Sequence, residues 1–229
     1  SSEAGVNFES EKFAVKVSAY NTDWKDRNLT KSVTTGQGDS GDTDVIFLKG
    51  IGQKHQGLEI EGSMKLNDMV RLDGAVSFGK WKFDGDADGL YTEYAEDAPK
   101  QTAYTYTLDG LYVGDQPQTA YVLGTTLTPM DGLRLQGIFK MYDKNYADWS
   151  PDSRELSGDA DRSQVWQAPA YNRLDLHAAY KLPKIAGYDM TLTGHLFNAL
   201  DAVYVQDAVD NSQYNGFGDK LHLAHNAEV

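Results

Sequence analysis

The sequence predicts an all-β chain whose antiparallel strands form part of a large transmembrane β-barrel. Apolar and polar residues alternate with a period of two along most of the chain, a pattern typical of strands with one apolar face. Short and long connections follow one another strictly between the predicted strands. Membrane barrels show the same parity, because tight turns lie on one side of the bilayer and long loops on the other.

Composition excludes several classes of protein. The 229 residues carry a net charge of −13, which argues against a nucleic-acid partner because such surfaces need clustered positive charge. Cysteine is absent, so disulfide frameworks, thiolate metal sites and cysteine nucleophiles are excluded. No apolar run approaches the roughly 20 residues of a membrane helix, whereas alternating strands cross a bilayer without such a run.

Eight strands are predicted, in four consecutive pairs. The alternating runs are 3–9, 13–20, 58–66, 70–78, 119–128, 133–142, 173–182 and 188–197. The pairs lie before residue 28, within 58–84, within 118–147 and within 169–204. In the third run, for example, Leu58, Ile60 and Met64 share one face, and Glu59 and Glu61 share the other.

The connections support this pairing. Short turns are predicted at Ser10-Glu11, Asn67–Met69, Pro129–Gly132 and Pro183–Gly187. Long loops are predicted at 28–57, 84–118, 147–169 and 204–228. The stretch Thr102–Val113 also has strand-like composition, and we interpret it as an extension above the membrane because a ninth spanning strand would break the parity.

The two faces of the strands are expected to meet different surroundings. The residues predicted to face lipid are Leu58, Ile60, Val76, Leu135, Phe139, Leu174, Leu176 and Leu192. Those predicted to face the lumen are Glu59, Glu61, Arg71, Arg134, Lys140, Arg173 and Asp175. An arginine at Leu135 should cost about 2–4 kcal/mol if this site is near the bilayer midplane.

The charged residues predicted to face the lumen argue against a closed eight-stranded barrel. Its narrow lumen would hold these charges without enough water, at several kcal/mol for each unpaired charge. We therefore expect an open arc whose edges pair with strands from elsewhere in a wider barrel. Aromatic residues gather near the strand ends, where they indicate either interfacial girdles or the rim of a soluble core; they are Tyr20, Trp24, Trp81, Phe83, Tyr142, Tyr146 and Trp149.

Several segments carry a family resemblance. They are Ala19–Arg27, His55–Glu61, Asp109–Asp115 with Pro117, Tyr146–Asp148, Pro169–Tyr171 and Leu174–His177. A further motif, Phe197-Asn198-x-x-Asp201-x-x-Tyr204, follows on the last predicted strand. Together these segments resemble the C-terminal part of a TonB-dependent receptor, of the variety common in gut Bacteroidetes.

This resemblance implies an outer-membrane barrel of about 22 strands with a plugged lumen. It implies active import of a large nutrient ligand, such as a ferric siderophore, haem, a glycan or a peptide. The implied partners are outer-membrane lipid, the rest of the same receptor and a TonB-type energy-coupling protein that acts through the plug. Residues 1–229 would then be the C-terminal part of the barrel, with the plug domain and the closing strand absent.

Alternatives from other classes stay open. A passive porin or structural outer-membrane barrel would lack the plug, and a soluble β-sandwich could also alternate. An enzyme is not expected, because no catalytic motif of the Gly-x-Ser-x-Gly or His-Glu-x-x-His kind is found. Asn198 and Asp201 are interpreted as a turn at a strand end.

The candidate binding residues lie mainly in the predicted loops. Asp84, Asp86 and Asp88, followed by Gly89, match the first half of a calcium loop, with Glu93 or Glu96 to complete the shell. Ordinary loop composition explains the same run. Aromatic residues that could contact a ligand, or could pack the loops together, are Tyr91, Tyr94, Tyr112, Trp149, Trp166 and Tyr214. His177 and His195 should be neighbours on the lumen face, in contact with a plug, water or a metal.

Overall fold

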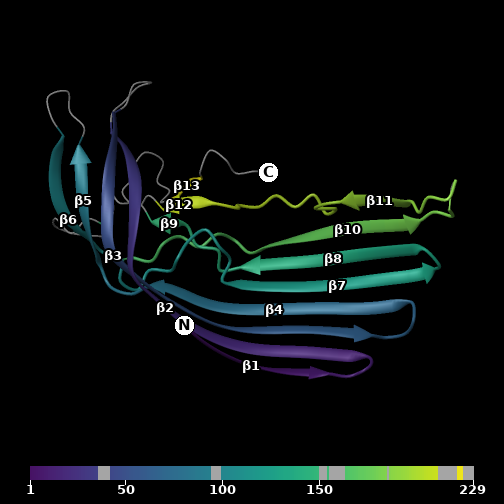
Figure 1. Cartoon of the computed structure of the whole chain (residues 1–229). Coiled ribbons are helices and arrows are strands. Elements are labelled where there is room, and N and C mark those ends of the chain that lie inside the picture. Colours follow the sequence, from purple (N-terminus) through teal and green to yellow (C-terminus); the bar gives the residue numbers. More distant parts are fainter. Residues whose placement is uncertain are drawn as a thin grey trace.

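The computed structural model describes residues 1–35, 42–93, 99–149, 154, 163–184, 186–210 and 221–223. One large antiparallel sheet dominates it, with the strand order β1-β2-β3-β4-β7-β8-β10-β11 (Figure 1). These strands are β1 (Ser2–Glu9), β2 (Phe13–Thr35), β3 (Asp42–Lys65), β4 (Val70–Phe83), β7 (Thr119–Met130), β8 (Leu133–Asp143), β10 (Tyr171–Lys181) and β11 (Thr191–Leu196). They correspond to the eight predicted strands, so the predicted pairing and the fold class are confirmed.

All four short turns lie at one end of the sheet, and the long connections lie at the other (Figure 1). Local chemistry explains the turns. The Asn67 side-chain oxygen accepts the N–H groups of Met69 at 2.8 Å and Val70 at 2.9 Å, which is how an Asn side chain closes a turn. At Asp131-Gly132, the glycine has a φ of +80°, a conformation that favours glycine.

The prediction of a long loop at 28–57 is wrong. Strand β2 continues to Thr35 and β3 begins at Asp42, and the two remain paired from Arg27–Ile51 to Thr35–Asp42. The Gly- and Asp-rich composition that suggested a loop is concentrated between residues 36 and 44. The flanking residues have the β-branched and aromatic composition that a strand favours.

The long hairpin bends where its register shifts between Trp24 and Leu29. Asp26 has a φ of +53° and Gly50 a φ of +70° at this bend. Extra residues of this kind form β-bulges, which turn a strand and increase its twist. The hairpin therefore rises away from the rest of the sheet beyond the bend (Figure 1).

Two further strands widen this rising hairpin. Strand β5 (Ala87–Glu93) pairs with β3, and β6 (Lys100–Tyr106) pairs with β5. The predicted extension at Thr102–Val113 is therefore confirmed as strand up to Tyr106, and the chain then leaves the sheet. A second small sheet joins β9 (Asp148–Trp149), β12 (Ala208–Asp210) and β13 (Leu221–Leu223).

Strand register confirms the two predicted faces. Residues directly opposite in an antiparallel pair point the same way, so Ile60 shares a face with Val17 and Val76. The same row continues to Tyr121 and Met141. All eight residues predicted to face lipid fall on this apolar face, and the seven predicted to face the lumen fall on the other.

The apolar face is broadly exposed. Its exposed large residues include Val6, Phe8, Phe13, Val17, Leu58, Met64, Phe78, Tyr121, Leu123, Leu127, Leu135, Phe139, Met141, Leu176, Leu192 and Leu196. A patch of this extent is far larger than a monomer exposes to water. In a membrane barrel it is the outer, lipid-facing surface, and the opposite polar face is the lumen face. That face carries a hollow of about 420 Å³ whose charged lining comes from Lys16, Glu61, Arg71 and Asp73.

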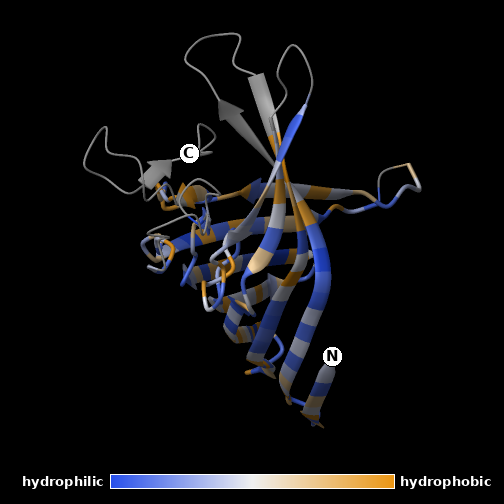
Figure 2. Cartoon of the chain, turned by 90° about the vertical axis from the view of Figure 1, so that its left-hand side faces the viewer, coloured by the Kyte–Doolittle hydropathy of each residue, from blue (hydrophilic) through white to orange (hydrophobic). Residues whose placement is uncertain are grey.

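The sheet is an open arc, as expected (Figure 2). Strands β1 and β11 are the two ends of its strand order and do not pair with each other. Unpaired backbone groups at a sheet edge are not tolerated in hydrocarbon, so the complete barrel wall needs a neighbouring strand at each edge. In the described part of the chain, no helix has the length and apolar character that a membrane crossing requires.

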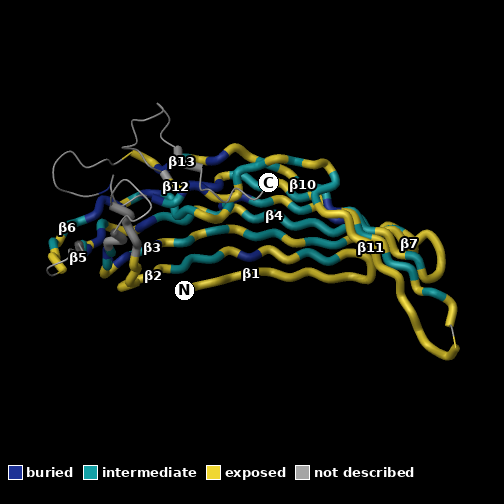
Figure 3. Tube along the Cα trace, turned by 90° about the horizontal axis from the view of Figure 1, so that it is seen from above, coloured by how far each residue is buried: buried dark blue, intermediate teal, exposed yellow. Residues whose placement is uncertain are grey.

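The main hydrophobic core is not part of the barrel wall. It lies at the end with the long connections, where the rising hairpin begins. Its buried members are Ile46, Leu48, Ile51, Phe83, Ala87, Tyr106, Leu108, Leu111, Tyr146, Trp149 and Val165. Buried residues gather at this end, whereas the outer strands are largely exposed or half-buried (Figure 3). The long connections are therefore packed like a water-soluble domain, and the wall beneath them is not.

Phe139 provides the test of the two faces. Leu135 is the third residue of β8 and lies close to the Asp131-Gly132 turn, so the cost of an arginine there should be only about 0–1 kcal/mol. Phe139 lies in the middle of the strand on the lipid face. Phe139→Arg should lower the free energy of unfolding by about 2–4 kcal/mol, measured by guanidinium titration of the protein in phospholipid vesicles.

Ile138→Arg is the matched control. Ile138 points to the lumen face between Gly124 and Asp175, so an arginine there stays close to water and to a carboxylate. Ile138→Arg should lower the free energy of unfolding clearly less than Phe139→Arg does. Equal losses for the two variants would contradict the assignment of the faces.

Candidate functional site

Aromatic residues line the lumen face at the end of the barrel where the long connections lie. Tyr20 is opposite Gly57, Trp24 is opposite Gln53, and Trp81 is opposite His55, so all of them share the face of Glu59. Interfacial girdles would require the lipid face instead. The girdle interpretation is therefore wrong for the strand aromatics Tyr20, Trp24, Trp81, Phe83 and Tyr142.

The sequence contained the signal that separates these two positions. Along β4 the lipid-facing residues have even numbers, whereas Trp81 and Phe83 have odd numbers. Along β2 the reverse holds, and Tyr20 and Trp24 are even. Position relative to the strand end suggested a girdle, but the parity along the strand decides which way a side chain points.

Four rings contact one another at this mouth of the barrel. The Trp81 indole N–H donates to the Tyr20 hydroxyl at 2.9 Å. The His55 ring stacks on Trp81 with centroids 5.2 Å apart and planes 13° apart, and Trp24 meets His55 edge-on at 6.4 Å. Gly57 makes room for this arrangement, because a Cβ there would collide with the Tyr20 ring. The rings are therefore held in fixed positions before any ligand binds.

Polar groups border the aromatic cluster. Arg27 donates to the Gln53 side-chain oxygen at 2.6 Å, and its guanidinium lies 5.5 Å from the centre of the Trp24 ring. A cleft of about 370 Å³ adjoins them, and Asp115, Asp148 and Trp81 also contribute to its lining. Aromatic faces beside a cation, an amide and carboxylates can hold a large ligand that has both flat and polar surfaces.

A second aromatic stack lies beside β4, where Tyr112 is opposite Lys82. The rings of Tyr112 and Tyr146 are parallel, with centroids 4.2 Å and planes 6° apart. The Lys82 ammonium lies 4.4 Å from the centre of the Tyr112 ring. Burial, reinforced by the neighbouring Tyr112, raises the pKa of Tyr146 to about 12, so this phenol remains neutral at physiological pH.

The predicted ligand-contact residues lie in different surroundings. Tyr91, Tyr112 and Trp166 are half-buried, and Tyr91 packs against Tyr104 with centroids 6.4 Å apart. Trp149 is only 1% exposed and packs edge-on against Phe83, so it supports the core and offers almost no surface to a ligand. Tyr94 and Tyr214 lie outside the described residues.

Two of the predicted calcium ligands accept hydrogen bonds from β6 and from the residues that follow it. One Asp86 oxygen accepts the N–H groups of Leu108 at 3.0 Å and Asp109 at 3.1 Å. Asp88 accepts the Thr105 hydroxyl at 3.0 Å, and Asp84 is exposed. Within the described ranges, no group of three or more His, Asp or Glu side chains could hold a metal ion. Glu96 lies outside these ranges, and calcium binding stays a prediction.

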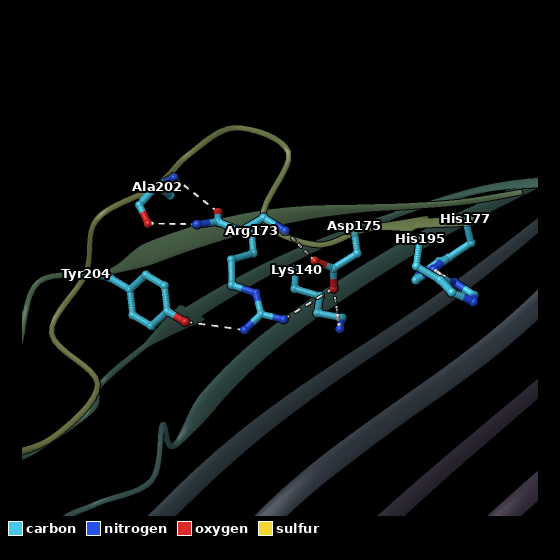
Figure 4. A network of polar contacts seen from close by, with 8 residues as sticks. Lys140, Arg173, Asp175, His177, His195, Ala202 and Tyr204 are labelled. Atoms are coloured by element: carbon cyan, nitrogen blue, oxygen red, sulfur yellow. Dashed lines mark hydrogen bonds and ion pairs between the residues drawn. The ribbon is translucent and has the colours of Figure 1, made fainter. Parts of the chain in front are cut away.

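The motif that follows β11 folds back over the lumen face. Asn198, with a φ of +50°, exchanges two hydrogen bonds of 3.1 Å with the backbone of Ala202 (Figure 4). Asn tolerates this left-handed conformation better than most residues. The interpretation of Asn198 and Asp201 as a strand-end turn agrees with this geometry.

Asp175 holds this turn against the barrel wall. It is 1% exposed, and its oxygens accept the Asn198 N–H at 2.9 Å and pair with Lys140 at 2.9 Å and Arg173 at 3.3 Å (Figure 4). Arg173 also donates to the Tyr204 hydroxyl at 3.3 Å. Tyr204 stacks on Tyr171 with ring centroids 4.2 Å apart, so the motif is anchored at both ends.

His177 and His195 are neighbours on the lumen face, as predicted. They are directly opposite each other on β10 and β11, and their Nδ1 atoms are 2.8 Å apart.

Comparison with known proteins identifies the family. Residues 1–199 match the family described as TonB dependent receptor-like, beta-barrel. The chain belongs to the TonB-dependent receptor family. No curated protein and no solved structure matches it. The match confirms the resemblance, and it agrees with an arc of an outer-membrane barrel in a family of receptors and transporters rather than enzymes.

Asp175 is the residue on which the wall network depends. Asp175→Ala removes the only carboxylate between Lys140 and Arg173 in the described network and frees the Asn198 N–H. The free energy of unfolding of the receptor in detergent micelles should fall by about 3 kcal/mol, because two cations lose a buried partner. Guanidinium titration followed by tryptophan fluorescence measures this loss.

The control is Asp73→Ala on the same face. Asp73 pairs with Arg71 at 2.7 Å, but both side chains are substantially exposed to solvent. Asp73→Ala should lower the free energy of unfolding by less than about 1 kcal/mol. If Asp175→Ala were no more damaging than Asp73→Ala, the anchoring role of Asp175 would be wrong.

Proposed function

We propose that this chain forms part of the wall of an outer-membrane importer for a large nutrient ligand, with energy supplied through a TonB-type partner. The candidate ligands are a ferric siderophore, haem, a glycan and a peptide. The aromatic cluster on the lumen face, formed by Tyr20, Trp24, His55 and Trp81, carries the proposal. A ligand that enters from outside meets this cluster before it reaches the charged lumen.

The chemistry of the cluster supports a large ligand with flat or weakly polar faces. Trp24 is 48% exposed, so its ring is available for stacking, and Arg27 and Gln53 beside it supply hydrogen-bond donors and an acceptor. Aromatic side chains provide much contact area at a low cost in conformational entropy. Porphyrins, catecholates, sugar rings and aromatic peptide side chains all present surfaces that suit such a site.

The lumen face below the cluster supports the presence of a polar partner inside the barrel. Glu61, Arg71 and Lys16 are exposed on this face, and charged groups are costly in a dry interior. A plug domain with hydrated contacts would satisfy them. A TonB-type protein would then act on the plug, and the wall described here would stay fixed while a path opens.

Energy coupling and ligand class can be tested together. In a strain whose only uptake route is this receptor, growth is measured with each candidate as the sole source of iron, carbon or nitrogen. One class should support growth, and uptake of that compound should stop when the proton gradient is dissipated. Uptake that continues without the gradient would favour the passive porin.

Trp24→Ala tests the aromatic cluster. The substrate concentration for half-maximal uptake should rise about tenfold, which corresponds to about 1.4 kcal/mol of lost binding. Phe78→Ala is the matched control, because Phe78 is also an exposed aromatic of the wall but points to lipid. An unchanged half-maximal concentration for Trp24→Ala would exclude the cluster from ligand binding.

A further inference from the structure

Two histidines lie side by side at the edge of the lumen face, away from the aromatic cluster. His177 of β10 is directly opposite Gln136 of β8 on one side and His195 of β11 on the other. Both imidazoles lie on the lumen side of the wall (Figure 4). The row through Thr126, Gln136, His177 and His195 contains no carboxylate, and it reaches a cation only at Arg71 of β4, which is opposite Thr126.

The two rings face each other through the same type of atom. Their Nδ1 atoms are 2.8 Å apart, and the ring centroids are 5.0 Å apart. The Phe197 ring stacks on His195 at 6.1 Å and meets His177 edge-on at 5.7 Å, so it borders both imidazoles. The pair is solvent-accessible, so an ion can reach it from the hydrated lumen.

We propose that His177 and His195 form a two-imidazole site for a divalent transition-metal ion of the Zn²⁺, Ni²⁺ or Cu²⁺ class. Neutral imidazole nitrogen is a preferred ligand of all three ions. Each nitrogen would lie at about 2.0–2.1 Å from the metal, which places the two nitrogens about 3.0–3.4 Å apart. The rings need to separate by only about half an ångström, and water from the lumen completes the coordination shell.

The residues that follow His177 along its row leave room for a bound cation, and the nearest arginine on the lumen face, Arg134, is one lumen-facing position further along β8, opposite Ala179. Gln136 and Thr126 are neutral, and the Gln136 amide donates to the Thr126 hydroxyl at 3.4 Å. Asp175, two residues before His177, already pairs with Lys140 and Arg173. A metal at this position would join β11, a strand of six residues, to the longer β10 by a bond that does not depend on the backbone ladder.

The test uses the full-length receptor in detergent micelles, purified without a polyhistidine tag. His222→Asn and His225→Asn are introduced into every protein, because these two histidines near the end of the chain could also bind metal. Zn²⁺ alone is titrated by calorimetry, and Cu²⁺ alone is followed by electron paramagnetic resonance. One ion per receptor and a signal from two nitrogen ligands are the expected results.

His195→Gln and His177→Gln should each weaken Zn²⁺ binding at least tenfold and remove one nitrogen from the Cu²⁺ signal. Glu59→Gln is the control, since Glu59 is also a possible metal ligand on the lumen face but lies on β3, away from the pair, and it should leave both readouts unchanged. Heat-modifiable electrophoretic mobility shows that each variant is folded. Two results would overturn the site: no Zn²⁺ binding by the parent protein, or binding that both glutamine variants retain.

Discussion

The need to pair every backbone N–H and C=O group within the bilayer is the constraint on which this structure depends. In hydrocarbon an unpaired backbone group has no water to bond with, so the chain crosses as a continuous antiparallel ladder from β1 to β11. A continuous ladder fixes which residues are opposite one another, and it sorts side chains into rows that cross many strands. The separation of lipid and lumen faces, the aromatic cluster and the histidine pair all result from this register.

The two halves of the molecule are stabilised in different ways. In the wall, large apolar side chains are exposed and meet lipid. Above the wall, the same strands β2 and β3 join β5 and β6 around a hydrophobic core that excludes water. The change from one regime to the other occurs at the bulged segment between Trp24 and Leu29. The aromatic cluster lies at this junction, where a rigid wall meets the long connections that face the outside.

The motif from Phe197 to Tyr204, which begins at the end of the family match, has a structural role. Asn198 closes a turn on Ala202, and Tyr204 stacks on Tyr171. Both contacts bring the chain back over the lumen side of β10, where the buried Asp175 receives the Asn198 N–H. The motif therefore holds its place by contacts with Asp175 and Arg173, which lie earlier in the sequence but next to the motif on the barrel wall.

The sequence by itself determined the strand pairs, the short turns, the two faces and the open arc. These depend on period-two alternation and on turn residues, which act locally and leave a direct pattern in the chain. The neighbouring positions of His177 and His195 also followed from parity. The tertiary structure alone decided the extent of β2 and β3 above the wall. There β3 pairs with β5, and partners such as Val45 and Thr92 are far apart in the sequence, in segments whose composition resembles a loop. The tertiary structure also decided that Trp149 is buried and that Trp24 and Trp81 both contact the His55 ring. Burial and ring contacts depend on which strands become neighbours. The residue pattern of a single strand does not specify those neighbours.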